Sequence, residues 1–118
     1  MFEILKTTAN VLNDGKAEEL FAVKVTEITS LADYFLMATA TSSTQVRSLS
    51  EKVEEKLKKI YNIEPKIEGR STDWLLLDYG FMIVHIFGRQ SREFYSLDKM
   101  WNDGEVINLE EILENEME

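Results

Sequence analysis

The side chains with the most catalytic potential in this chain are those of Asp73, Asp78 and His85. Together they suggest metal-dependent nucleotidyl transfer, in which two carboxylates on one strand hold a pair of metal ions. Such carboxylates must be two residues apart, because alternate side chains of a strand point to the same face. Asp73 and Asp78 are five positions apart, and no predicted strand carries a DxD or DxE pair. We therefore expect no enzyme, with a cryptic nucleotide-binding or nucleotidyltransferase domain as the alternative.

Other familiar reaction centres also lack their residues. His85 is the only histidine and the chain has no cysteine, so no two-histidine or thiolate metal site can form. A nucleophilic serine in a GxSxG elbow is absent, and the glycines are too dispersed for a phosphate-binding loop. We expect no catalytic residue, no metal and no cofactor. A lone histidine in an apolar strand favours a structural role for His85.

The segment from Trp74 to Phe87 is apolar almost throughout and predicts a β-hairpin covered on both faces. Its only turn signal is Tyr79-Gly80. Folding the chain there places three pairs opposite each other: Asp78 with Phe81, Leu76 with Ile83, and Trp74 with His85. The other face is aliphatic and suits contact with a helix; it comprises Leu75, Leu77, Met82, Val84 and Ile86. The mixed face is either a second core layer or a surface that receives a partner.

Three elements are predicted in the first forty residues. Apolar residues at helical spacing between Ile4 and Leu12 predict a helix that stops at Asn13-Asp14-Gly15. Residues 20–25 and 34–40 are apolar and partly β-branched, which predicts two strands.

A second helix is the strongest in the sequence. Ser42 and Gln45 have the spacing of a capping box, and the apolar stripe that follows comprises Val46, Leu49, Val53, Leu57 and Ile60. Pro65 then begins a short extended segment, and residues 91–95 and 97–102 suggest two helical turns after the hairpin. This order predicts an α/β (α+β) domain, with a small mixed β-sheet flanked by helices.

Composition limits the class of protein. The chain has 118 residues, 44% of them hydrophobic, and a net charge of −9. That charge argues against direct nucleic-acid binding through phosphates and favours a basic protein partner. Without cysteine, a signal peptide or a membrane-spanning segment, we expect a soluble cytoplasmic protein that makes no membrane contact.

The end of the chain is strongly acidic. Asp103-Gly104 precedes residues 105–118, which hold six glutamates and no lysine or arginine. We expect residues 1–104 to form a single domain and residues 105–118 to be an acidic tail. The alternative is a docked amphipathic helix, formed by Val106, Ile107, Leu109, Ile112 and Leu113.

Several sequence segments, in the same order along the chain, resemble those of a known family. They are Ala32-Asp33-Tyr34-Phe35, Thr41-Ser42-Ser43-Thr44-Gln45-Val46, Trp74-Leu75-Leu76-Leu77-Asp78-Tyr79-Gly80, Val84-His85-Ile86-Phe87 and Arg92-Glu93-Phe94-Tyr95-Ser96-Leu97 with Trp101. In these segments the chain resembles the ribosomal silencing factor family, whose members are also called RsfS or Iojap-like proteins. The resemblance covers residues 16–101.

The resemblance implies a nucleotidyltransferase-like fold that has lost its catalytic carboxylates. It also implies binding to the large ribosomal subunit through ribosomal protein fourteen, which blocks subunit joining and represses translation under nutrient limitation or in stationary phase. A role of the same contact in large-subunit assembly stays open, and so does a homodimer of the free protein.

By position, the family's WxLLDYG hairpin and REFY segment carry its characteristic surface. The partner-binding candidates are therefore Trp74, Asp78, Tyr79, Arg92, Glu93, Phe94 and Tyr95. Two positions depart from the family pattern, because Phe81 replaces an aspartate and Gly88-Arg89 replaces a histidine-proline pair. Phe81 either extends an exposed apolar patch beside Asp78 or packs inward.

Overall fold

The structure is a computed structural model that describes residues 2–25, 32–69, 74–88, 105–107, 109 and 113. Its elements in chain order are α1 (Phe2–Asp14), β1 (Glu18–Lys24), β2 (Tyr34–Ala40), α2 (Ser43–Tyr61), β3 (Lys66–Glu68), β4 (Trp74–Asp78), β5 (Met82–Gly88) and β6 (Glu105–Ile107). The predicted order of helices and strands is confirmed as far as residue 88. The helical turns predicted at 91–95 and 97–102 lie outside the described residues.

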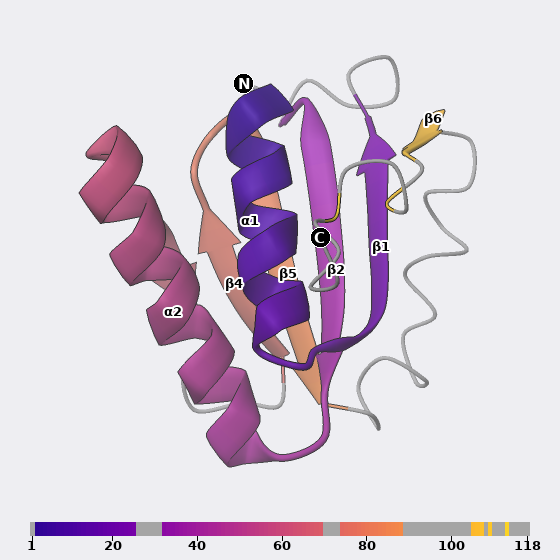
Figure 1. Cartoon of the computed structure of the whole chain (residues 1–118), viewed down its shortest axis with the longest axis vertical. Helices are drawn as coiled ribbons and strands as arrows, with labels where there is room; N and C mark the ends of the chain where they lie inside the picture. The colour runs from indigo at the N-terminus through magenta and orange to yellow at the C-terminus, as the bar shows by residue number, and fades with distance from the viewer. Residues whose placement is uncertain are drawn as a thin grey trace.

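The strands form one mixed sheet in the order β3-β4-β5-β2-β1-β6. The central strands β2 and β5 are parallel, and all other neighbours are antiparallel. A parallel pair needs a long crossover, which here contains α2. Figure 1 shows that α1 and α2 both lie on the same face of the sheet. The predicted fold class, a small mixed sheet with helices, is confirmed.

The helices cover the aliphatic face of the sheet. Leu5 and Leu12 of α1 and Leu49 and Leu57 of α2 are fully buried. With the strand residues that point toward the helices they form one core, which we call the helix-side cluster. The prediction for Ile60 was wrong, because its side chain is 51% exposed. Tyr61 makes the contact at this turn instead, since its hydroxyl is 2.7 Å from Thr7 Oγ1 on α1. Within the described part of the chain, no helix is long and apolar enough to cross a membrane.

The start of α2 ties three elements together through Gln45. Ser42 Oγ accepts the Gln45 backbone N–H at 3.1 Å, as the capping-box spacing predicts. The Gln45 side chain differs from that motif, because its Oε1 accepts the N–H of Thr41 at 2.6 Å. Its Nε2 donates to Gly15 O at 3.1 Å, where α1 has just ended. A Cβ on Gly15 would lie 2.6 Å from the Leu49 side chain, so glycine permits this close approach.

The hairpin forms, but its register differs from the prediction by two residues. The pairs are Trp74 with Phe87, Leu76 with His85, and Asp78 with Ile83. The reason is a longer turn, in which the Tyr79 N–H donates to Met82 O at 2.9 Å. Because a shift of two preserves the alternation of side chains, the two faces keep their predicted members except for Phe81. Phe81 lies in the turn and packs against the helix-side cluster, so it packs inward.

Residues 105–107 form a strand at the other end of the sheet. The sequence predicts the start of an acidic tail here; instead, β6 pairs antiparallel with β1, and Ala22 lies opposite Ile107. Ile107, Leu109 and Leu113 are partly buried against the helix-side cluster. Two effects therefore hold this segment against the domain: β6 pairs with the edge of β1, and the apolar side chains are removed from water.

Candidate functional site

The sheet face opposite the helices carries a cluster of aromatic rings, which we call the aromatic face: Phe35, Trp74, His85 and Phe87. The Trp74 and Phe87 rings are stacked with centroids 5.3 Å apart, and the His85 and Phe87 rings are stacked at 5.8 Å. Phe35 lies 5.1 Å from His85. Phe87 is completely buried, whereas Trp74 is only half-buried. The mixed face of the hairpin is therefore a second core layer with a partly open margin.

His85 belongs to this core layer. Its side chain is 6% exposed, and its Nδ1 accepts the indole N–H of Trp74 at 3.2 Å. An indole N–H can only donate, so this bond requires an unprotonated Nδ1 on the imidazole. The bond fixes the orientation of the Trp74 ring, which leaves His85 with a positioning role. The structural role predicted for His85 agrees with this burial.

The partly open margin of this face runs along β4. Along this strand the buried side chains Leu75 and Leu77 alternate with the half-buried side chains Trp74, Leu76 and Asp78. We call these three half-buried residues the β4 row. Alternate residues of a strand share a face, so the row presents an aromatic, an aliphatic and an acidic side chain side by side. A central apolar group with a polar neighbour is typical of protein–protein contact surfaces.

Asp78 has a local structural role at the end of the row. Its Oδ1 accepts the Gly80 N–H at 2.8 Å, which makes an Asx turn. Gly80 has a φ of +89°, a conformation that glycine adopts without steric cost. The turn uses one carboxylate oxygen, and the half-buried side chain keeps its charge at the surface beside Leu76.

Tyr79 lies on the other side of the sheet from Trp74. Its side chain packs against the helix-side cluster, and its hydroxyl is buried with no hydrogen-bond partner in the described part of the chain. Burial raises the pKa of Tyr79, and the charge of Glu54 raises it further. Trp74 and Tyr79 are both partner-binding candidates from the sequence, but the structure places their side chains on opposite faces of the sheet.

The raised pKa of Tyr79 predicts a loss of stability in alkaline solution. An unfolded tyrosine releases its proton near pH 10, while the folded side chain still holds it. The unfolded state then binds fewer protons, so the free energy of unfolding falls as pH rises above 10. Tyr79→Phe removes this contribution and is expected to flatten the decline. Urea unfolding of both proteins at neutral and alkaline pH measures it, and an identical decline in the two would contradict the prediction.

The other predicted site residues lie outside the described residues: Asp73, Arg92, Glu93, Phe94 and Tyr95. Leu76 was missing from the predicted contact residues, although it lies between Trp74 and Asp78 on the same face. Its signal was its place on the mixed face of the hairpin. Among the described residues, no three histidine, aspartate or glutamate side chains gather closely enough to hold a metal ion.

Comparison with known proteins decides the family. The family model described as "Ribosomal silencing factor during starvation" matches residues 2–118. The chain belongs to the ribosomal silencing factor family. One member, the ribosomal silencing factor RsfS of Zymomonas mobilis, is 36% identical over 103 residues, which cover 86% of this chain and 77% of the relative.

A solved structure and a eukaryotic relative extend this assignment. The crystal structure of a protein from Chromobacterium violaceum matches with a TM-score of 0.80 at 31% identity, covering 84% of this chain and 83% of that one. The mouse protein called mitochondrial assembly of ribosomal large subunit protein 1 is 29% identical over 96 residues. Those residues cover 78% of this chain but only 42% of the mouse protein. The ribosomal silencing factor family is thus ribosome-associated, and the predicted resemblance is confirmed.

Proposed function

We propose that this chain binds the large ribosomal subunit through ribosomal protein fourteen and blocks docking of the small subunit by occupying its place. The β4 row is the observation that carries the proposal. Trp74 and Leu76 are half-buried apolar side chains of β4. Leu76 lies where β4 pairs with both β3 and β5, and the Trp74 ring is held by stacking on Phe87 and by its hydrogen bond to His85. Rigid, partly exposed aromatic residues make strong interface anchors, because little conformational entropy is lost when they bind.

Charge supports a protein partner for this row. The chain has a net charge of −9, and Asp78 adds a carboxylate beside the two apolar anchors. Ribosomal proteins are commonly basic, so complementary charges would steer the two surfaces together. We propose a steric mechanism without catalysis. The alternative, a nucleotide-binding domain that uses Asp73, Asp78 and His85, is disfavoured because the His85 side chain is 6% exposed and already bonded to Trp74.

A role in assembly of the large subunit is the second candidate. The mouse relative is named for assembly of the mitochondrial large subunit, which favours this alternative. The same surface would serve both roles, because an assembly factor would bind an immature large subunit through the β4 row. The two roles differ in timing: a silencing factor acts on mature subunits, whereas an assembly factor changes the yield of mature subunits.

The order of addition tests the steric mechanism. Adding the protein to separated mature subunits is expected to prevent formation of full ribosomes, because the occupied face cannot receive the small subunit. Joined ribosomes are expected to resist, because their small subunit already covers that face. Light scattering of subunits mixed before or after addition measures the difference. Unimpeded joining of subunits that demonstrably carry the protein would reject steric silencing and leave the assembly role.

Two variants of Asp78 test whether its charge meets a basic surface. Asp78→Asn keeps an oxygen that accepts the Gly80 N–H but removes the charge, whereas Asp78→Lys reverses the charge and loses the turn. We expect Asp78→Asn to weaken large-subunit binding by about 1 kcal/mol, and Asp78→Lys by several kcal/mol, because like charges at an interface repel. Co-sedimentation with large subunits measures both. Wild-type binding by a correctly folded Asp78→Lys protein would remove Asp78 from the contact.

A further inference from the structure

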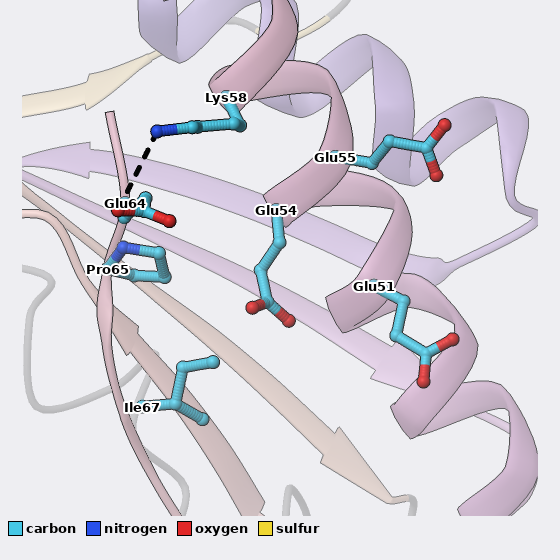
Figure 2. Close-up of a pocket in the computed structure, with 7 residues that line it drawn as sticks. All are labelled: Glu51, Glu54, Glu55, Lys58, Glu64, Pro65 and Ile67. Atoms are coloured by element: carbon cyan, nitrogen blue, oxygen red, sulfur yellow. Dashed lines mark ion pairs between the residues drawn. The ribbon is translucent and has the colours of Figure 1, made fainter. Parts of the chain in front are cut away.

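A groove of about 640 Å³ runs between α2 and the segment that leads into β3. It is lined by Glu51, Glu54, Glu55, Lys58, Glu64, Pro65 and Ile67. In Figure 2, Glu54 points from α2 toward Pro65 and Ile67, and Lys58 reaches across to Glu64. The groove lies on the helix side of the sheet, whereas the β4 row lies on the opposite side, so the two surfaces are separate.

One wall of the groove is β3, the edge strand of the sheet in the described part of the chain. Among the described strands, β3 pairs only with β4 and is the last strand of the sheet. Its outer side therefore offers backbone N–H and C=O groups to an additional strand. Ile67 lies opposite Leu77, which is buried beneath the helices, so the Ile67 side chain faces the groove. Side chains of an added strand that align with Ile67 would enter the groove beneath α2.

The charges of the groove select the occupant. Four glutamates and one lysine line the groove, and the Lys58 Nζ is 3.7 Å from Glu64 Oε2, so that lysine is already paired within the chain. The Glu54 carboxylate is held in place, because its Oε2 accepts the Ser50 hydroxyl at 3.2 Å. Pro65 and Ile67 add apolar surface at the strand side of the groove, which suits the methylene stem of a lysine or arginine side chain.

Other occupants fail on charge. Nucleic acid would bring phosphates against the glutamates, and a second copy of the chain would bring the same glutamates against each other. Residues 105–118 of the chain itself hold six glutamates and no basic residue. We propose that the β3 edge and this groove bind an extended basic segment of a partner protein, which adds a strand to the sheet and places alternate basic side chains beneath α2. This surface does not depend on ribosome binding by the β4 row.

A synthetic peptide of alternating lysine and threonine, with a fluorescent label, is the probe. Anisotropy titration of the full chain at low ionic strength is expected to show saturable binding, and the same peptide with glutamate in place of lysine is expected not to bind. Two further peptides carry N-methyl groups on either all lysine or all threonine amides. In an added strand, the amide N–H groups of either the lysines or the threonines point toward β3, but not both. One methylated peptide is therefore expected to lose binding and the other to keep it. Equal binding of the two would overturn strand addition.

Matched charge variants locate the site on the protein. Glu54→Gln and Glu51→Gln are each expected to weaken binding of the lysine peptide about two- to fivefold, because each removes one ion pair near the surface. Glu54→Gln retains an oxygen for the Ser50 hydroxyl, so the fold should be preserved. Glu3→Gln on α1 makes the same change in net charge outside the groove and is expected to leave affinity unchanged. An equal loss in Glu3→Gln and Glu54→Gln would show attraction by net charge alone and would overturn the proposal.

Discussion

Trp74→Ala is expected to weaken binding to the large ribosomal subunit by at least about 2 kcal/mol, or roughly thirtyfold, as for a central aromatic anchor. The half-buried indole is the largest apolar side chain of the β4 row. Its position is set from within the fold, because it stacks on Phe87 and donates its indole N–H to His85. Quantitative co-sedimentation of the variant with purified large subunits measures the change.

The same substitution also removes contacts inside the protein, so a second variant separates binding from stability. Trp74→Phe keeps an aromatic ring over Phe87 but loses the hydrogen bond to His85. We expect Trp74→Phe to keep most of the affinity for the large subunit, although it loses the hydrogen bond to His85 as Trp74→Ala does. Circular dichroism and urea unfolding must show both variants folded at the assay temperature. Unchanged affinity in a folded Trp74→Ala protein would exclude this ring from the ribosome contact.

Phe87→Ala is expected to lower the free energy of unfolding by about 3–5 kcal/mol, which is typical of removing a large aromatic side chain from a core. Phe87 is completely buried on the face that no described helix covers, and both Trp74 and His85 stack on its ring. Because small domains are stable by only about 5–15 kcal/mol, this loss would remove a large part of the total. Equilibrium urea unfolding followed by circular dichroism measures it.

Ile60→Ala provides the control for that measurement. Ile60 is an apolar residue of the predicted helix stripe, but its side chain is 51% exposed in the last turn of α2. Its replacement is expected to change the free energy of unfolding by about 0.5 kcal/mol or less. A loss for Phe87→Ala as small as that for Ile60→Ala would show that the aromatic face contributes little to stability.

Local sequence patterns predict the two faces of the hairpin correctly but not its register. The alternation of apolar residues assigned Leu75, Leu77, Met82, Val84 and Ile86 to the helix side, and all five are buried there. The register was two residues out, because the Tyr79-Gly80 signal does not reveal that Phe81 also belongs to the turn. The hydrogen bond from Tyr79 N–H to Met82 O closes that longer turn.

The sequence by itself determined the elements whose causes are local. The C-terminal end of α1, the start of α2, the bounds of β2 and the faces of β4 and β5 follow from caps, β-branched runs and side-chain alternation. It also determined the family, through long ordered motifs that the match over residues 2–118 confirms.

Only the tertiary structure decided which of these elements meet. The parallel pairing of β2 with β5, the placement of both helices on one face and the return of β6 to β1 join residues far apart in the chain. The same holds for the separation of Trp74 from Tyr79 and for the exposure of the β4 row. Such contacts depend on which competing surfaces lose the most water on packing, and a local pattern of residues does not contain that information.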